Sequence, residues 1–251
     1  MDALPPLPSP LVTQLQRARR FAALTGAGIS AESGVPTFRA AQTGLWARYR
    51  PEELATPEAF DRDPALVWSW YAWRRQLVAA ATPNPGHRAL VDLANHRPLT
   101  LITQNVDDLH RRAGSEEVVE LHGNINRCRC TATGRVVAPW DEGETAPPPS
   151  PWGGVLRPDV VWFGEALPEA ALEKALQAAL DCEVFLVVGT SALVYPAAAL
   201  PLAALEVGAM VVEINPEATP LSDRAHFSLR GAAGELLPQV VAACVDASSQ
   251  G

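Results

Sequence analysis

The stretch TGAGISAESGVPTFR, at Thr25–Arg39, decides the class of fold that this chain adopts. The apolar run Phe21–Leu24 precedes it and predicts a buried strand, so Gly26 and Gly28 fall at the carboxyl end of that strand. Open α/β sheets bind ligands at this edge, and glycines there let backbone N–H groups approach a pyrophosphate closely. The stretch therefore predicts a nucleotide site on a parallel sheet.

The glycine pair has two other interpretations. It can form a plain tight turn between a strand and a helix, or, with Ala31, it fits the G-x-G-x-x-A pattern of hydride-transferring dehydrogenases. Such an enzyme needs a second strand soon afterwards, ending in an acidic residue about 20 positions on that binds the ribose. Residues 35–82 are instead rich in Pro, Trp and Arg, with a helix-like patch at Pro64–Ala80 and no β-branched run. The first strand is thus followed by a long segment without a second strand, and not by a βαβ unit, which argues against a dehydrogenase.

Length and charge narrow the class further. The 251 residues can bury a substantial core, as one domain or as a large lobe with a smaller inserted one. A formal net charge of −8 argues against a direct nucleic-acid partner, because such proteins carry basic patches. The start, MDALPPLPSP, lacks the features of a signal peptide, and the four cysteines form no secreted disulfide framework, so we expect a cytoplasmic protein.

The run Val184–Leu205 holds 22 residues without a charge, which is long enough to span a bilayer. Because Gly189, Pro196 and Pro201 interrupt it, we interpret it as a buried strand, a ligand-binding turn and an apolar helix, with no membrane partner. Other strand-like runs alternate with helical stretches and indicate a doubly wound parallel sheet. These runs are Leu99–Thr103, Val118–Leu121, Val160–Phe163, Phe185–Val188 and Met210–Ile214.

Four further blocks accompany the opening loop: TQNVDDLH at Thr103–His110, ELHG at Glu120–Gly123, GVLRPDVVWFGE at Gly154–Glu165 and VVGTS at Val187–Ser191. Together they resemble the sirtuins, the NAD-dependent protein lysine deacylases, in family order. The resemblance implies an α/β fold, with a Rossmann-like doubly wound parallel sheet and a smaller inserted lobe. The large lobe would comprise roughly residues 11–38, 84–123 and 156–247, and the small lobe roughly 39–83 and 124–155. NAD would be the cofactor, and acyl-lysine proteins or peptides the partners.

The resemblance also implies a set of NAD-binding residues. Asn105 and Asp107 would hold the nicotinamide amide, and the segment Glu32–Thr37 would form a flap that carries Phe38 and Arg39. Turn formation and helix capping are the plain alternatives for the Asn and Asp residues. The full set is Gly26, Ala27, Gly28, Glu32, Thr37, Phe38, Arg39, Gln104, Asn105, Asp107, Gly189, Thr190, Ser191, Asn215, Glu217 and Ala233.

His122 matches the catalytic histidine of the family. In sirtuins the acyl-lysine oxygen attacks C1′ of the nicotinamide ribose as nicotinamide departs, and the histidine then acts as a general base on the 2′-hydroxyl. The products are nicotinamide and 2′-O-acyl-ADP-ribose. An imidazole, with an unperturbed pKa of about 6.5, suits this role near neutral pH. A lone histidine can equally be structural, and the same NAD pocket could serve a mono-ADP-ribosyltransferase or a non-catalytic NAD sensor.

Two further groups bear on the substrate. The stretch Val160–Gly164 resembles the segment along which sirtuins bind the peptide as an added strand, and Val161 and Phe163 would line the acyl-lysine tunnel. Core packing is the alternative for Trp162 and Phe163. Tyr71 and Arg74 resemble the Y-x-x-R signature of sirtuins that remove negatively charged acyl groups. Their alternative is an aromatic packing residue beside a solvated Arg. A guanidinium and a phenol are suited to a carboxylate, so we expect desuccinylation and demalonylation, with deacetylation retained.

The metal site departs from the family pattern. Sirtuins generally hold a structural zinc with two Cys-x-x-Cys pairs, and such sites need four ligands. Here Cys130 takes the first position and Thr133 the second, while Pro149 and Trp152 fall where the other pair should be. Cys128 could add one thiolate. We therefore predict no stoichiometric zinc.

Overall fold

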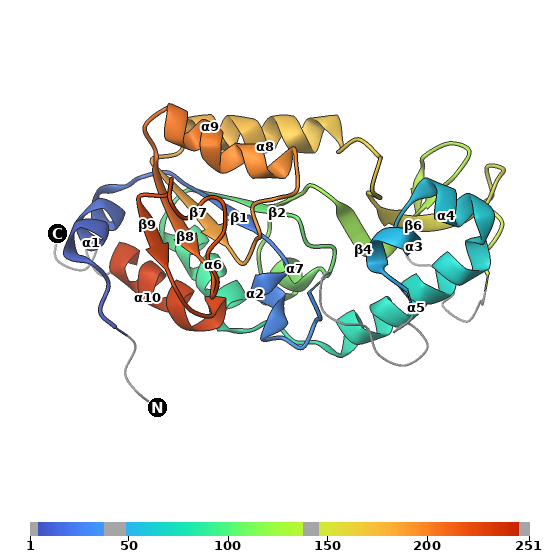
Figure 1. Ribbon diagram of the computed structural model, residues 1–251, viewed down its shortest axis with the longest axis horizontal. Coiled ribbons are helices and arrows are strands. Elements are labelled where there is room, and N and C mark those ends of the chain that lie inside the picture. The colour runs from blue at the N-terminus through green and yellow to red at the C-terminus, as the bar shows by residue number, and fades with distance from the viewer. Residues whose placement is uncertain (1–4, 38–48, 138–145, 246–251) are drawn as a thin grey trace.

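The computed structural model describes residues 5–37, 49–137 and 146–245 (Figure 1). Its larger sheet has the strand order β3-β2-β1-β7-β8-β9, and every pairing in it is parallel. The chain starts in the middle of this sheet, moves to one edge and then crosses to the other, which confirms the predicted doubly wound fold. The strands are β1 (Phe21–Thr25), β2 (Leu99–Thr103), β3 (Val118–Glu120), β7 (Val184–Val188), β8 (Met210–Ile214) and β9 (Phe227–Leu229).

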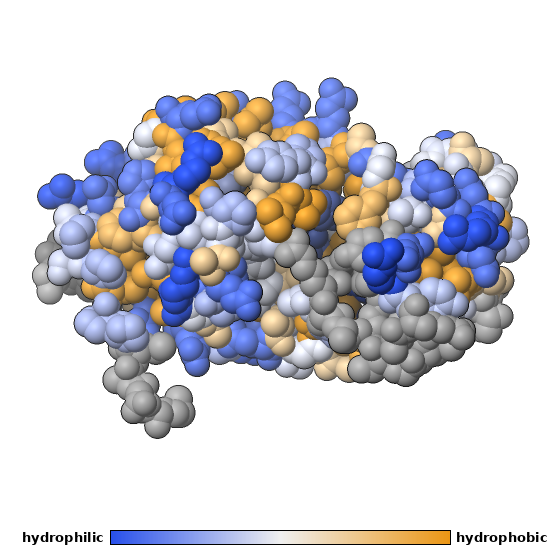
Figure 2. Space-filling view, viewed as in Figure 1, coloured by the Kyte–Doolittle hydropathy of each residue, from blue (hydrophilic) through white to orange (hydrophobic). Residues whose placement is uncertain are grey.

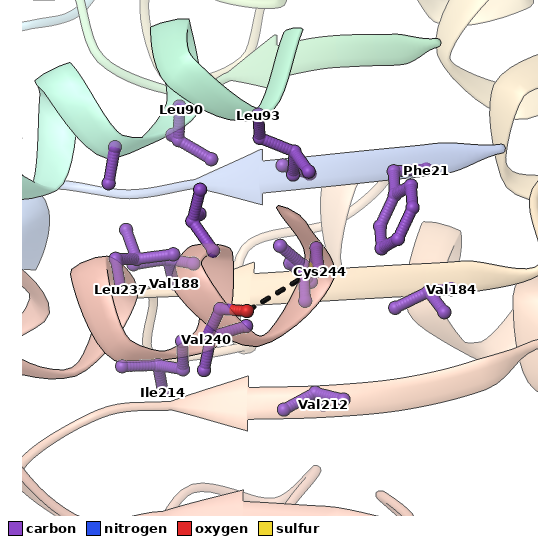
Figure 3. Packing of buried hydrophobic residues seen from close by; sticks show 14 of the residues in the cluster. Phe21, Leu90, Leu93, Val184, Val188, Val212, Ile214, Leu237, Val240 and Cys244 are labelled. Carbon is purple, nitrogen blue, oxygen red and sulfur yellow. Dashed lines mark hydrogen bonds between the residues drawn. The ribbon is translucent and has the colours of Figure 1, made fainter. Parts of the chain in front are cut away.

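Helices cover both faces of this sheet (Figure 1). One face carries α1 (Ser9–Arg17), α6 (Pro85–His96) and α10 (Ala233–Val245), and the other carries α8 (Glu169–Asp181) and α9 (Leu200–Glu206). Strands buried on both faces are typically apolar throughout, as the VFLVV of β7 is. Figure 3 shows Leu90 and Leu93 of α6 beside β1, and Leu237 and Val240 of α10 near Val188 of β7 and Ile214 of β8.

The second sheet is smaller and antiparallel. It consists of β5 (Val136–Val137), β4 (Gly123–Cys130) and β6 (Leu156–Val160), in that order. The expected strand at Val160–Phe163 in the parallel sheet is therefore wrong. The strand begins earlier and pairs with β4 instead. Its sequence, LRPDV, looks too polar for a buried strand, but all five residues are buried because the charged ones form ion pairs.

Where the structure describes the segment between the first loop and β2, this segment is helical, as expected. It contains α3 (Pro51–Leu54), α4 (Pro57–Arg62) and α5 (Pro64–Ala80), and α5 matches the predicted helix. Side chains that accept hydrogen bonds from the first turn start the last two helices: Thr56 accepts from Ala59 N, and Asp63 accepts from Leu66 N. The three helices pack with the small sheet at one end of the molecule (Figure 1). The exact division into two lobes stays a prediction.

The uncharged run Val184–Leu205 divides as predicted. It forms β7, a turn, the 3₁₀ helix η2 (Ala197–Ala199) and most of α9. In the part of the chain that the structure describes, we find no helix with the length and hydropathy needed to cross a membrane.

Candidate functional site

Two glycine loops meet at the carboxyl ends of β1 and β7, where the order of the strands reverses. Gly26 N donates to Val188 O at 2.9 Å, and Gly28 N donates to Gly189 O at 2.7 Å. A Cβ on Gly28 would lie 2.7 Å from Gly189 Cα, and Gly189 itself has a φ of 61°. The glycines are thus needed for the close contact between the two loops, at the sheet edge where α/β folds bind ligands. Thr190 and Ser191 continue the β7 loop there, and Ala27 lies between the first two glycines.

The loop after β2 joins the same edge. Gln104 Nε2 donates to Thr190 Oγ1 at 2.9 Å, and Asn105 Nδ2 donates to Gly26 O at 3.1 Å. Asp107 is buried and accepts a 2.6 Å hydrogen bond from the Ser30 hydroxyl. Burial raises the pKa of the Asp107 carboxyl, and the hydrogen bonds from Ser30 and from Leu109 N oppose that rise. The structure therefore brings together predicted residues from three separate segments.

Two buried histidines behind this loop escaped the sequence reasoning. His87 Nε2 lies 3.4 Å from Ser30 Oγ, and His110, in α7 (Leu109–Ala113), lies 2.8 Å from Thr25 Oγ1 through Nε2. Their rings are 4.9 Å apart. Burial lowers the pKa of His87 to about 4 and that of His110 to about 3, so both imidazoles are neutral. They support the loop that carries Asp107 without adding charge to it.

His122 follows β3 at the entrance to the small sheet. Its Nδ1 lies 2.8 Å from Gln104 O, and since a carbonyl only accepts, Nδ1 carries the proton and Nε2 is the acceptor of the ring. Burial lowers the pKa of His122, and the hydrogen bond to Gln104 O opposes this. Gly123 turns with a φ of 79°, and a Cβ there would overlap Asp159 O. A neutral, oriented imidazole of this kind can take up a proton.

The predicted adenosine side lies beyond β8. Asn215 Nδ2 donates to Thr190 O at 3.4 Å, which ties it to the β7 loop, and Glu217 O accepts from Arg230 at 2.8 Å. Ala233 is buried at the start of α10. The carboxylate of Glu32 accepts from Gly234 N at 2.7 Å, so it caps that helix. Thr37 ends its described segment, and Phe38 and Arg39 lie outside the described residues.

The predicted acyl side lies on α5. Tyr71 is buried, and its hydroxyl accepts a 2.9 Å hydrogen bond from Trp162 Nε1. The Arg74 guanidinium lies 5.0 Å from the centre of the Trp70 ring. Burial lowers the pKa of Arg74, and Tyr71 and Asp107 both favour its charged form, so Arg74 lies within electrostatic reach of Asp107. This arrangement differs from a plain solvated arginine.

The segment Val161–Gly164 borders the same region. Val161 N donates to His122 O at 2.9 Å, and Phe163 N donates to Ala55 O at 2.9 Å. The Phe163 side chain is 44% exposed, and Gly164 adopts a φ of 87° with open space where a Cβ would be. In the space-filling view, hydrophobic residues form several surface patches, and one of them lies toward the middle of the molecule (Figure 2).

The residues around Cys130, at the place where sirtuins generally hold zinc, do not fit a zinc ion. Cys130 Sγ donates to Gly153 O at 3.1 Å; burial raises its pKa, but hydrogen bonds from Ser150 and Thr133 outweigh this and bring the pKa to about 7. Ser150 and Gly153 thus contact Cys130, one residue on from the predicted positions Pro149 and Trp152. Within residues 5–37, 49–137 and 146–245, three or more His, Cys, Asp or Glu never gather as metal ligands would. The absence of zinc stays a prediction.

Comparison with known proteins places these observations in a family. The model of the Sir2 family matches residues 26–196. NAD-dependent protein deacylase 2 of Pyrobaculum aerophilum is 55% identical over 229 residues, which cover 90% of this chain and 92% of that protein. NAD-dependent protein deacylase 1 of Pseudomonas aeruginosa is 51% identical over 241 residues, which cover 92% and 96%.

Solved structures agree with these relatives. The crystal structure of a Sir2 homologue–NAD complex superposes with a TM-score of 0.91 at 46% identity, over 96% of this chain and 95% of that one. A Sir2 mutant in complex with a deacetylated p53 peptide and 3′-O-acetyl ADP-ribose superposes with a TM-score of 0.80 at 32% identity, over 92% and 96%.

Proposed function

The chain belongs to the Sir2 family and is an NAD-dependent protein deacylase, and on this premise we propose that it prefers succinyl and malonyl lysine while retaining deacetylation. The family match and the relatives confirm three predictions: the family, the NAD cofactor and protein deacylation. The observation that carries the acyl preference is that Tyr71 and Arg74 lie one turn apart on α5, close enough for the Arg74 charge to act on the Tyr71 hydroxyl.

The glycine loops after β1 and β7 supply the backbone that would face the pyrophosphate of NAD. Asn215 and Glu217, after β8, would hold the adenosine ribose, and Asn105 and Asp107 the nicotinamide amide. The residues fit this group, because two glycine loops and amide and carboxylate side chains converge on one sheet edge. NAD supplies the electrophilic ribose carbon that receives the acyl oxygen.

His122 would then act as the general base. Its protonated Nδ1 is held by Gln104 O, so Nε2 is the nitrogen that can accept a proton from a ribose hydroxyl. Since burial lowers its pKa, the imidazole stays neutral at physiological pH and is ready to accept. The Gln104 side chain also donates a hydrogen bond to Thr190, so Gln104 holds both the base and the loop after β7.

Arg74 and Tyr71 would recognise the carboxylate of the acyl group. A carboxylate that enters an apolar pocket loses its hydration, and a cation within the pocket compensates for that loss. The Tyr71 hydroxyl adds a directed hydrogen bond. The peptide backbone would lie along Val161–Gly164, where backbone pairing accepts many sequences.

The test of the acyl preference is the variant Arg74→Met, which removes the charge and keeps much of the side-chain volume. A hydrogen bond to a charged group contributes about 1.5–3 kcal/mol, or roughly 10- to 150-fold in affinity. We expect desuccinylation to fall by at least about tenfold, mainly through KM, because the contact already exists in the ground state. Deacetylation should be unchanged or slightly improved.

The measurement uses NAD with acetyl, succinyl and malonyl peptides and follows the products by mass spectrometry. A matched control is Arg88→Met, which changes an exposed arginine on α6 and should leave both activities intact. If Arg74→Met lowered both activities by the same factor, Arg74 would be a structural residue. Transfer of ADP-ribose to a protein side chain, without loss of the acyl group, would instead favour a mono-ADP-ribosyltransferase.

A further inference from the structure

Trp162 connects the predicted peptide segment to the predicted acyl pocket. It lies between Val161 and Phe163 in sequence, and its side chain is only 2% exposed. Its indole Nε1 reaches across to α5 and donates a 2.9 Å hydrogen bond to the Tyr71 hydroxyl, while Tyr71 itself is 1% exposed. A buried hydrogen bond between these two side chains therefore joins the two parts of the site that would contact the substrate.

The chemistry of the pair determines the direction of this bond. An indole N–H can only donate, so the Tyr71 oxygen has to accept from Trp162. A phenolic proton prefers the plane of its ring, and one of the two in-plane positions at the oxygen is now occupied. The Tyr71 proton must therefore point to the other side. Among the residues that the structure describes, none accepts it.

The phenol also keeps its proton. Burial raises the pKa of Tyr71 to about 12, although the charge of Arg74 opposes that rise. The Tyr71 hydroxyl is therefore neutral and accepts from Trp162. Its own proton points away from Trp162 and can be donated to a bound group. A carboxylate at the end of an acyl chain supplies an acceptor, and the methyl group of an acetyl does not.

Contacts on several sides hold the Trp162 side chain and backbone in place. Its backbone N–H donates to Glu165 Oε2 at 2.8 Å, and the Arg157 guanidinium lies 3.3 Å from the centre of its ring. Arg157 in turn holds Glu165 through two hydrogen bonds of 2.5 and 2.9 Å. The Phe60 ring packs at 5.3 Å. These contacts keep the indole N–H directed at Tyr71.

We propose that Trp162 is a positioning residue for acyl selectivity: it fixes the Tyr71 hydroxyl as a hydrogen-bond donor toward the carboxylate of succinyl or malonyl lysine. This inference rests on the proposed acyl preference. Trp162 acts through Tyr71, so its effect should appear only with acyl groups that carry a carboxylate and should disappear when the Tyr71 hydroxyl is removed.

The first test is Trp162→Phe, alone and combined with Tyr71→Phe. We expect the single change to lower kcat/KM for desuccinylation about three- to tenfold through KM, the range for one neutral hydrogen bond. Deacetylation and the KM for NAD should stay within about twofold of wild type, since those steps do not use the Tyr71 proton. In the Tyr71→Phe background, Trp162→Phe should cause no further selective loss.

A second variant separates the N–H from the packing. Replacement of Trp162 by β-(3-benzothienyl)alanine keeps the shape of the indole and exchanges only its N–H for sulfur, so it should reproduce the selective loss in a normally folded enzyme. The packing control is Phe60→Leu, which changes a ring against Trp162 but keeps the hydrogen bond. It should leave the ratio of succinyl to acetyl activity unchanged.

The outcomes separate this inference from the function on which it rests. If Arg74→Met lowers desuccinylation selectively while the benzothienyl replacement does not, the role of Trp162 is wrong and the acyl preference stands. The role of Trp162 is equally wrong if the losses of the Trp162 and Tyr71 variants multiply in the double variant. If Arg74→Met itself shows no selectivity, the proposed acyl preference fails, and the inference fails with it.

Discussion

At the scale of single residues, the protonation state of His122 governs the proposed chemistry. Its pKa is lowered below the ordinary value of about 6.5, because burial outweighs the hydrogen bond to Gln104 O. A base has to be neutral, so activity should be constant around neutral pH and should fall as the pH decreases through this lowered pKa. The midpoint of the acidic limb of kcat/KM, measured with acetyl peptide, is therefore expected below pH ~6.5.

The control is His122→Ala, which should abolish deacylation and leave NAD binding largely intact, because the base acts after the cofactor is bound. General acid–base catalysis typically contributes about 10²- to 10⁴-fold, so the loss should be obvious. A variant with more than about half of wild-type turnover would exclude His122 as the base, given that typical contribution. An acidic limb with its midpoint above pH ~7 would show that another group titrates.

At the scale of helices and strands, the sequence predicted most of the large sheet, because its strands are continuous apolar runs. It also predicted the helix Pro64–Ala80, between a capping Asp63 and a polar loop. It missed the strand Leu156–Val160, since Arg157 and Asp159 hide a buried strand from any hydropathy pattern.

The candidate site divides in the same way. Its glycine loops and polar strand ends were predictable, because they follow apolar runs and resemble family blocks. The contacts of Ser30 with His87 and of Trp162 with Tyr71 join residues 57 and 91 positions apart. Local patterns carry no signal for such pairs, which arise only when the helices pack on the sheets.

The turn after β4 carries the prediction about zinc. One thiol, two hydroxyls and a carbonyl surround the position where the family holds its metal, so we expect well under one zinc per chain in protein purified without chelator. Elemental analysis measures this directly. One zinc per wild-type chain would contradict the prediction.

A matched variant tests whether the position is correctly located. Thr133→Cys, Ser150→Cys and Gly153→Cys together would place four thiols around the site of Cys130. Gly153 has a φ of 86°, which costs a cysteine on the order of 1–3 kcal/mol, but structural zinc binding contributes about 10–16 kcal/mol. This triple variant should bind one zinc, and failure to do so would show that the ligand positions are misassigned.

At the scale of the whole molecule, the two buried histidines tie global stability to pH. His87 begins α6 and His110 lies in α7, and both pack behind the edge where β1 and β2 end. In the folded protein the pKa of His87 is about 4 and that of His110 is about 3, so both stay neutral above pH ~4. In the unfolded chain each takes up a proton near pH ~6.5. The unfolded state thus binds more protons below pH ~6.5, so stability has to fall as the pH decreases.

The expected loss follows from the same linkage. At pH ~5.5 each neutral histidine costs about 1.4 kcal/mol relative to neutral pH, so the free energy of unfolding should drop by about 3 kcal/mol, before most carboxylates titrate. Urea unfolding at pH ~7.5 and ~5.5 measures this. His110→Gln should lower stability at both values yet show a pH-dependent drop that is smaller by about 1.4 kcal/mol, because one proton-linked group is gone. His96→Gln changes a histidine with a 42% exposed side chain at the end of α6 and should keep the full drop. If His110→Gln kept the full drop as well, the acid sensitivity would come from other groups, and His110 would be protonated in the folded protein.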